Sequence, residues 1–275
     1  MMTTTLRPAE PLQQNPDGTR SRHYQVCVNS RPVGAIHLGT HPVFGAAVAR
    51  IMRLRIEEPD RRRGRGTVAA LAAEEVARGW GCRRIESAVP ADPRAALAIA
   101  TTLGYVVRNR NMEKPLGAAP PVLPDGSAVR PMTDAEFGPW LAKGQEDYAG
   151  DWIRRGVPEA EARAKAAADH AALLPDGRAT EGMLLSVLEH EGTPVGTLWL
   201  SVRGERAYVF DVETTAGHRG RGHGRTLMLL AEAQSAASGN RRIGLNVFAG
   251  NTPAERLYDS LGYTTTQYSM YKPLL

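Results

Sequence analysis

The chain contains little cysteine and no long apolar run. Its two cysteines, Cys27 and Cys82, have no CxxC partner, so we expect small buried residues there and no metal site. No stretch reaches 18 apolar residues, which excludes a membrane-spanning helix of ordinary length. The first eight residues lack the charged head and apolar core of a signal peptide. We therefore expect a cytoplasmic protein with no membrane partner.

Aromatic residues are also scarce, at 6% of the chain, although the formal net charge is +5. Nucleic-acid-binding proteins usually interleave aromatic residues with a basic run or carry a groove-reading helix. Here the arginines cluster around two glycine-rich loops instead. We expect an anionic partner of another kind and no nucleic acid, and the sequence leaves a monomer and a homodimer open.

The chain repeats itself. Residues 61–116 align without a gap onto residues 219–274, with 21 identities in 56 positions. In unrelated chains of ordinary composition, about one position in fifteen would match. A length of 275 residues also suits two domains, each large enough for a core of its own. We therefore interpret the chain as a duplicated domain, whose copies can be compared residue by residue.

The second repeat carries the complete pattern of elements. Thr133 followed by Glu136 is typical of a helix N-terminus, and Gly262 of a helix C-terminus. Strands are predicted at 128–132, 184–190, 194–202, 207–213, 243–248 and 268–272, and helices from 133 to about 172, from 226, and at 252–261. The order is one strand, helices, three strands, and then helix, strand, helix and strand.

The first repeat has the same second half but a shortened first half. Only residues 9–22 separate its first strand from the next, so the helices that follow strand one are missing. Three prolines mark residues 118–126 as a linker. We predict two tandem domains, at 1–117 and 127–275, of the α/β (α+β) class. Each is expected to form a mixed, mostly antiparallel sheet with flanking helices.

A glycine-rich loop precedes a predicted helix in each repeat. In the second repeat it reads Arg219-Gly-Arg-Gly-His-Gly224 and follows the fourth strand. Backbone N–H groups at a helix N-terminus favour an anion, and glycine lets the chain approach that anion closely. Flanking arginines add charge-assisted hydrogen bonds. The loop is therefore a candidate pyrophosphate cradle, with a glycine-rich turn and solvated arginines as the alternative.

Two further residues extend this pattern. Asn251 follows the fifth strand, and Tyr258 comes seven residues later. Together with Arg219, Gly222 and Gly224, they resemble the GNAT superfamily of N-acyltransferases. That family's loop has Gln or Arg, two residues, Gly, one residue, then Gly or Ala, followed downstream by a cofactor-contacting Asn and a Tyr general acid. The chain is similar to a tandem pair of such domains, closely over residues 127–275 and more loosely over residues 5–116.

The resemblance implies that acetyl-CoA binds where the fourth and fifth strands separate, and that an amine attacks its thioester directly. The pantetheine arm would pair with the backbone of the fourth strand, and the pyrophosphate would lie on the loop amides. The residues implied to bind acetyl-CoA are Val212, Glu213, Thr214, Arg219, Gly220, Arg221, Gly222, His223, Gly224, Arg225 and Asn251. Tyr258 would give a proton to the departing thiolate. No metal is implied.

The general base is open. Many family members have a carboxylate at the position of Asn246, and an amide cannot take a proton. Glu213, our candidate, and Asp211 are the nearest carboxylates on the fourth strand. Strand alternation sets them on the face opposite Phe210 and Val212. A bulge would be needed to turn either one inward, and a water-mediated base is an equal alternative.

Comparison of the copies indicates which one is active. The first copy keeps the loop glycines, but Pro93 aligns with Asn251 and Ala100 with Tyr258. It has therefore lost both polar residues, as well as the helices on the acceptor side. We predict that the first copy does not catalyse and instead supports the second domain or walls its cleft.

These observations predict an N-acetyltransferase that acts on a primary amine of a small molecule. A composition rich in Ala, Arg and Gly suits antibiotic inactivation or natural-product tailoring. Two alternatives stay open. One is an acyltransferase whose donor is an acidic phosphopantetheinyl carrier protein, and the other is a non-catalytic CoA-binding module.

The helical insert of the second repeat is the candidate acceptor surface, because the first repeat lacks it. It contains an acidic and aromatic cluster made of Glu146, Asp147, Tyr148, Asp151 and Trp152. Carboxylates beside aromatic rings suit a cationic amine. The alternative is an amphipathic helix with solvated acids and a buried tryptophan.

Overall fold

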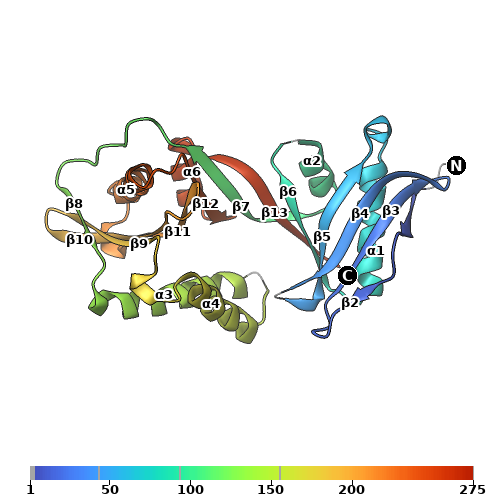
Figure 1. The fold of residues 1–275 in the computed structure, drawn as a ribbon, viewed down its shortest axis with the longest axis horizontal. Helices are drawn as coiled ribbons and strands as arrows, with labels where there is room; N and C mark the ends of the chain where they lie inside the picture. Colours follow the sequence, from blue (N-terminus) through green and yellow to red (C-terminus); the bar gives the residue numbers. More distant parts are fainter. Residues whose placement is uncertain (1–3, 43, 93, 155, 275) are drawn as a thin grey trace. The chain divides into compact units, whose positions relative to one another are not determined.

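The computed structural model describes residues 4–42, 44–92, 94–154 and 156–274. The chain forms two compact units (Figure 1). The first unit comprises Met1–Asn111, Phe248–Gly250 and Thr265–Leu275, and the second comprises Met112–Val247 and Asn251–Thr264. None of the helices in the described part of the chain is long and apolar enough to cross a bilayer.

The first unit is a mostly antiparallel sheet. Its strands are β1 (Thr4–Pro8), β2 (Gln13–Gln14), β3 (Arg20–Val28), β4 (Arg31–His41), β5 (Gly45–Ile56), β6 (Arg84–Pro90) and β13 (Thr264–Pro273). They are hydrogen-bonded in the order β1-β3-β4-β5-β6-β13, and only β5 and β6 run parallel to each other. Between β1 and β3 the described chain holds no helix, as the shortened first repeat predicts.

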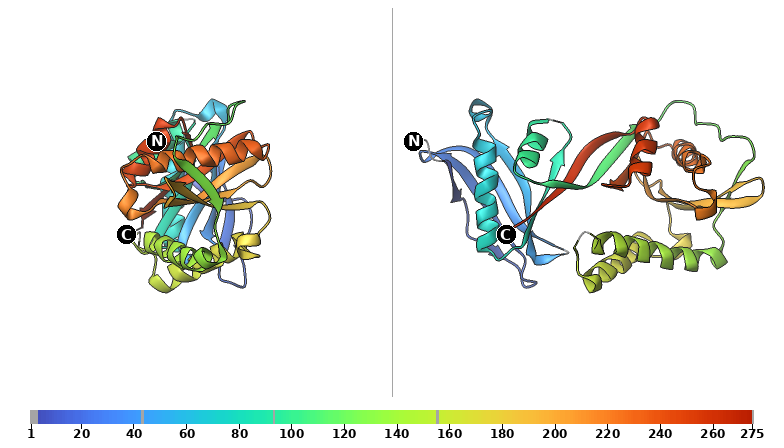
Figure 2. Two further views of the ribbon diagram at one scale, coloured as in Figure 1. Left: turned by 90° about the vertical axis from the view of Figure 1, so that its left-hand side faces the viewer. Right: turned by 180° about the vertical axis from the view of Figure 1, so that it is seen from behind.

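Both helices of the first unit lie on one face of this sheet. They are α1 (Arg65–Gly79) and α2 (Arg94–Thr102), and a short 3-10 turn, η1 (Glu58–Asp60), precedes α1. Ala73 and Ala77 of α1 and Ala100 of α2 pack in one buried cluster with Ile36 and Ile85 of the strands. The opposite face of the sheet carries no described helix of this unit (Figures 1 and 2).

The second unit has helices on both faces of its sheet. Its strands follow the order β7-β12-β11-β10-β9-β8. The strands are β7 (Val106–Pro115), β8 (Ser127–Pro131), β9 (Met183–His190), β10 (Thr193–Ser201), β11 (Arg206–Thr214) and β12 (Arg242–Phe248). β7 joins this unit at Met112, and its first six residues belong to the first unit. The helices are α3 (Asp134–Ile153), α4 (Glu159–Leu173), η2 (Gly177–Ala179), η3 (Ala216–His218), α5 (His223–Ala237) and α6 (Thr252–Ser260). From β8 to α6 these elements follow the order predicted for the second repeat, whose last strand, β13, lies in the first unit.

Two buried clusters hold these layers together. Leu227 of α5 and Tyr258 of α6 pack with the strands on one face. Trp140 of α3 packs with Trp199 and Phe210 on the other face. The sheet of the second unit is therefore covered by α5 and α6 on one side and by α3 and α4 on the other.

The start of α3 forms the capping box that the sequence predicts. The Glu136 carboxylate accepts a hydrogen bond from the Thr133 backbone N–H at 2.8 Å, and the Thr133 hydroxyl accepts one from the Glu136 N–H at 3.4 Å. The Arg130 guanidinium lies 2.7 Å from the same carboxylate and, with these bonds, lowers the pKa of Glu136 to about 2. The box thus fixes the entry into the helical layer.

The last strands of the two repeats are exchanged between the units. We predicted domains at 1–117 and 127–275, but β13, from the second repeat, pairs with β6 of the first unit. In return β7, from the first repeat, is the neighbour of β12. Met270 lies in the core of the first unit, and its repeat counterpart Met112 lies in the core of the second.

A matched pair of ion pairs accompanies the exchange. In the first unit, Lys272 of β13 lies 2.7 Å from the buried carboxylate of Glu74 on α1. In the second unit, Lys114 of β7 lies 2.8 Å from the buried carboxylate of Glu232 on α5. These residues are repeat counterparts, 158 positions apart. Each unit therefore takes its last strand from the other repeat and satisfies a buried acid with it.

Candidate active site

The parallel strands β11 and β12 separate partway along their length. Their register pairs Arg206 with Arg242 and ends where Val209 pairs with Leu245. Beyond Val209, the β12 side of β11 has no strand partner within the described part of the unit. The backbone from residue 210 to residue 214 is therefore open on that side, as the resemblance implies for a pantetheine site.

A β-bulge begins where the two strands separate. On the β10 side of β11, Trp199 pairs with Asp211, but the next residue, Leu200, pairs with Val209. Phe210 is therefore the extra residue of the bulge. Such a bulge allows a carboxylate of β11 to turn inward, which regular strand alternation would not.

The bulge decides which way the acids of β11 point. Residues directly opposite in a ladder share a face of the sheet, so Asp211 lies on the face of Trp199 and Glu213 on the face of Thr197. That face is covered by α3 and α4. Two polar atoms on it, the Thr197 hydroxyl oxygen and Trp199 Nε1, are buried and have no hydrogen-bond partner among the described residues.

The negative charge of Asp211 acts on the Tyr258 hydroxyl. Burial, and next the negative charge of Glu213, raise the pKa of Asp211 from 3.8 to about 6. Tyr258 is only 6% exposed, and burial together with the charge of Asp211 raises the pKa of its hydroxyl above the ordinary value. At neutral pH, Asp211 is therefore mostly ionised and Tyr258 is protonated. These are the forms that a general base and a general acid need.

Glu213 is held in a salt bridge instead. Lys143 of α3 lies 2.8 Å from its carboxylate and also 2.6 Å from Asp147, and Arg219 approaches Glu213 to 3.7 Å. Both carboxylate oxygens of Glu213 are thus already engaged by the Lys143 ammonium group. The geometry thus favours Asp211 over Glu213, the candidate base that the sequence suggested.

The glycine-rich loop has the backbone conformation of an anion cradle. Gly220 and Gly222 both adopt positive φ, at 77° and 89°, and Gly222 is the N-cap of α5. Within the described chain, no backbone hydrogen bond is donated by the N–H groups of residues 220–222. A Cβ added at either glycine would meet no atom within 4 Å. The exposed amides therefore suit a pyrophosphate.

The side chains around the loop differ in how well they can contact a bound anion. Arg221 is exposed. Arg219 donates to the Thr214 carbonyl oxygen at 3.2 Å, and Arg225 donates to the Ser260 hydroxyl at 2.6 Å. His223 is buried, and burial and nearby His190 lower its pKa, so it is neutral at pH 7. The loop amides and the arginines thus provide the positive potential.

Asn251 and the α3 cluster have partners within the protein. The Asn251 side chain caps α6 by accepting a hydrogen bond from the Ala254 N–H at 3.4 Å. Trp152 is buried and Tyr148 half-buried. The three acids of the cluster pair with basic side chains: Glu146 with Arg163, Asp147 with Lys143, and Asp151 with Arg154. Asp147 of this cluster is linked to Glu213, because Lys143 forms a salt bridge with each of them.

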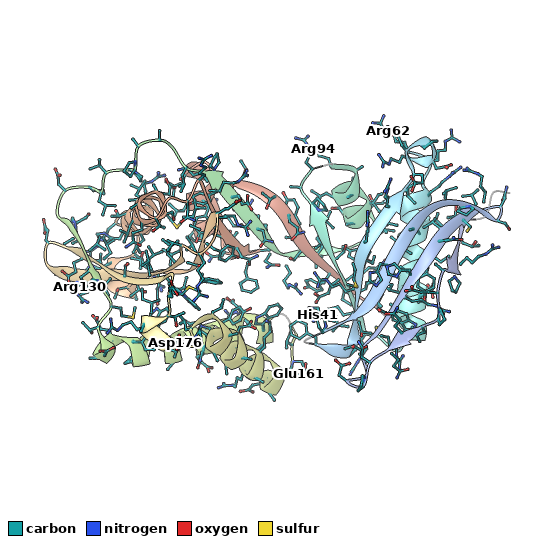
Figure 3. All side chains as sticks on the ribbon, viewed as in Figure 1. His41, Arg62, Arg94, Arg130, Glu161 and Asp176 are labelled. Carbon is teal, nitrogen blue, oxygen red and sulfur yellow. The ribbon has the colours of Figure 1, made fainter. Side chains whose placement is uncertain are left out.

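The first copy has the same backbone geometry but different residues at the proposed catalytic positions. Its ladder between β5 and β6 ends at Ile51, and Met52 forms the same bulge. Its loop also keeps positive φ, at 73° for Gly64 and 59° for Arg62, which Figure 3 labels beside α1. Arg53 stands where the second copy has Asp211.

In the first copy, Ala100 and Pro93 stand in place of the proposed acid and the proposed cofactor contact. Ala100, which aligns with Tyr258, is buried on α2. Pro93, which aligns with Asn251, lies outside the described residues. Among the described residues, no cluster of three or more His, Cys, Asp or Glu side chains could hold a metal ion.

Comparisons with known proteins agree with this geometry. A model of the acetyltransferase (GNAT) family matches residues 3–105 and 145–263. The "uncharacterized N-acetyltransferase YycN" of Bacillus subtilis is 29% identical over 153 residues, which cover 53% of this chain and 97% of that protein. The mycothiol acetyltransferase of Thermomonospora curvata is 30% identical over 246 residues, which cover 84% of this chain and 75% of that protein.

A solved structure extends the likeness to most of the chain. A GCN5-related N-acetyltransferase from Sphaerobacter thermophilus superimposes with a TM-score of 0.60 at 18% identity, over 92% of this chain and 80% of that one. At this identity, the likeness bears on the fold alone.

Proposed function

The chain belongs to the acetyltransferase (GNAT) family, and on that premise we propose that its second unit transfers an acetyl group from acetyl-CoA to a primary amine of a small molecule. The observation that carries the proposal is the bulge at Phe210. It turns Asp211 onto the face covered by α3 and α4, and the charge of Asp211 acts on Tyr258. The first copy has Arg53 and Ala100 at these two positions, so we assign no catalysis to it.

Acetyl-CoA supplies the thioester that is attacked. The open backbone of residues 212–214 would pair with its pantetheine arm, because β12 leaves that edge of β11 free. The amides of residues 220–224, with Arg219, Arg221 and Arg225 around them, would hold its pyrophosphate. Asn251 keeps its proposed cofactor contact in addition to its role as a helix cap.

In the reaction we propose, Asp211 takes a proton from the ammonium group of the acceptor, directly or through a water. The free amine attacks the thioester carbonyl carbon, the C–S bond breaks, and Tyr258 gives its hydroxyl proton to the thiolate. The new amide nitrogen then gives up its remaining extra proton, which restores the Tyr258 hydroxyl, and the proton on Asp211 leaves to solvent. General base and general acid catalysis of this kind are each typically worth about 10²- to 10⁴-fold in rate. The pKa of Asp211, about 6, suits a base that works near neutral pH.

The acceptor surface is proposed to lie between β11 and α3. The carboxylates of Asp211 and Glu213, with Asp147 behind Lys143, give this face the negative charge that a cationic amine needs. The cluster of Glu146, Asp147, Tyr148, Asp151 and Trp152 stays part of the proposal. Changing its three acids to amides is expected to raise the KM for the amine and leave the KM for acetyl-CoA unchanged, which steady-state kinetics would measure.

A small-molecule acceptor is favoured by one relative. The mycothiol acetyltransferase of Thermomonospora curvata, which matches 84% of this chain, is named for a small thiol. Antibiotic inactivation and natural-product tailoring also involve small amines and stay within the proposal. A non-catalytic CoA-binding role is disfavoured because it would need neither Asp211 nor Tyr258, which the first copy replaces by Arg53 and Ala100.

The experiment that tests this function follows thiol release from acetyl-CoA. Purified protein is supplied with acetyl-CoA and a panel of primary amines, and the product of any active pair is identified by mass spectrometry. We expect an N-acetylated product from at least one amine. Thiol release at the same rate with and without every amine would mean thioester hydrolysis and would contradict the proposal.

A further inference from the structure

One sheet face of the first unit has none of the described helices of that unit over it. Because α1 and α2 share one side of this sheet, the opposite side of β3, β4 and β5 has no helix of this unit on it (Figures 1 and 2), and it is called the open face below. The ladder fixes which side chains point to it, since cross-strand partners share a face. His23 pairs with His37, His37 with Arg53, Ala35 with Arg55, and Gly39 with Arg50.

This open face is positively charged. The residues of the first unit contain 18 Lys and Arg against 9 Asp and Glu, a net charge of +9, whereas those of the second unit carry a net charge of −4. Arg53 and Arg55 of β5 are exposed on this face. Arg53 has no ion pair with any described residue, and Arg55 has only a surface pair with Glu57 at 3.4 Å. Surface pairs of this kind are weak and leave most of the positive potential in place.

An exposed methionine lies among these arginines. Met52, the bulge residue of β5, is 54% exposed, and its sulfur would lie 3.2 Å from a Cβ at Gly39, which puts it on the open face. Methionine is an adaptable apolar contact and is common on binding surfaces. An apolar centre with charged neighbours is the usual arrangement of a protein-binding site. A phosphate backbone would need the arginines but would make no use of Met52.

The same face of the second unit has the opposite charge. Asp211 and Glu213 there align with Arg53 and Arg55, and α3 and α4 cover them. The first copy has therefore lost the covering helices and replaced both acids by arginine. Loss of the helices alone leaves an open face, and the reversal of charge gives that face a preference for an acidic partner.

We propose that this open face docks an acidic, helical carrier protein that bears a phosphopantetheine thioester. Arg53 and Arg55 stand two residues apart on one strand, about 7 Å. Acidic side chains at i and i+4 of a helix lie about 6 Å apart, so one helix can meet both arginines while an apolar residue contacts Met52. The partner's thioester is the same reactive group as that of acetyl-CoA, and in this the inference rests on the proposed function.

Binding is measured on the full-length protein and does not depend on turnover. The probe is a purified bacterial holo-acyl carrier protein, labelled with a fluorophore on its phosphopantetheine thiol and followed by anisotropy. The test variants are Arg53→Glu/Arg55→Glu and Met52→Asp. The control is Arg62→Glu/Arg94→Glu, which changes the net charge equally at positions near the starts of α1 and α2 (Figure 3).

We expect the double reversal to weaken Kd at least about tenfold and Met52→Asp several-fold, with the control within about twofold of wild type. Raising the salt concentration from about 50 to about 300 mM should weaken the wild-type complex. Hydrogen exchange should show protection confined to β4 and β5. Melting curves confirm that each variant is folded.

Three results would overturn the proposal. They are no binding at a carrier concentration of about 100 µM, equal weakening by the control, and tighter binding of a DNA oligonucleotide on the same residues. Turnover of acetyl-CoA is followed in parallel. Face-specific binding of the carrier without any turnover would refute the proposed function alone, and turnover without binding would refute this inference alone.

Discussion

Asp211 stands directly opposite Trp199 in the β10–β11 ladder, and the bulge residue Phe210 separates it from the next pair. Without the extra residue, regular alternation would turn Asp211 toward α5, into the apolar core that contains Val209 and Leu227. The bulge therefore brings a carboxylate to the acceptor side of the sheet.

The first prediction concerns Asp211 as base. Asp211→Asn keeps the size of the side chain but cannot take a proton, so kcat/KM for the amine should fall about 10²- to 10⁴-fold, with little change in acetyl-CoA binding. In the wild type, kcat/KM should fall below a pH of about 6, where Asp211 becomes protonated. The control, Glu213→Gln, should cost far less. An equal loss in both variants would mean that Glu213 is as good a candidate for the general base as Asp211.

The same substitution should stabilise the protein at neutral pH. The pKa of Asp211 is raised on folding, from 3.8 to about 6, so the wild type loses stability as pH rises through this window. Asp211→Asn removes that loss, a gain of at most about 3 kcal/mol above pH 6 that disappears below pH 4. Urea unfolding at pH 4 and pH 7.5 measures the difference. A variant that is less stable at pH 7.5 would mean that Asp211 is not desolvated.

Tyr258 is tested by removing one oxygen atom. Tyr258→Phe keeps the buried ring in the core, so the fold and the KM for acetyl-CoA should barely change. The thiolate then leaves without its proton donor, and kcat should drop about 10- to 1000-fold. Steady-state kinetics with a fixed amine measure both constants. Turnover at the wild-type rate would reduce Tyr258 to a packing residue.

The exchanged strands predict which unit each lysine supports. Lys272→Met leaves Glu74, which is 1% exposed, without its nearest cation and should destabilise the first unit by about 3 kcal/mol. Hydrogen exchange should then quicken in β6 and not in β12. Lys114→Met, the matched control, should affect β12 through Glu232. Adding Glu74→Gln to the first variant should restore part of the loss. Effects in the opposite units would contradict the exchange.

Most of the fold follows from the sequence because the repeat supplies an internal comparison. Glycines that must adopt positive φ, such as Gly222 and Gly64, recur at the same offset as the strands and helices around them. The missing helices of the first copy are likewise visible as a gap in the alignment.

The strand exchange could not be predicted in this way. The two last strands carry the same key residues, Met-x-Lys-Pro-Leu, so each can fill either core and neutralise either buried glutamate. Local sequence therefore does not decide which sheet a strand joins.

The general base could not be predicted from the sequence either, for another reason. A bulge depends on register, and nothing in the composition of β11 marks Phe210 as an extra residue. One signal was present: the copies differ at Asp211, which aligns with Arg53, and a change of charge at a shared position points to a change of role.

The central claim is that acyl transfer belongs to the second unit alone, and the two loops offer matched variants that test it. Both Gly222 and Gly64 are N-caps at positive φ with open space around them, so Gly222→Glu and Gly64→Glu impose similar backbone strain. Gly222→Asn controls for strain without charge, since asparagine tolerates this conformation.

The deciding measurement is thiol release from acetyl-CoA in these three variants, beside calorimetric binding of acetyl-CoA. Gly222→Glu should lose binding and turnover, because a carboxylate would meet the pyrophosphate. Gly222→Asn should keep most of both, and Gly64→Glu should turn over near the wild-type rate. If Gly64→Glu, while folded, loses about a hundredfold in kcat and Gly222→Glu does not, then catalysis belongs to the first unit and the account is wrong.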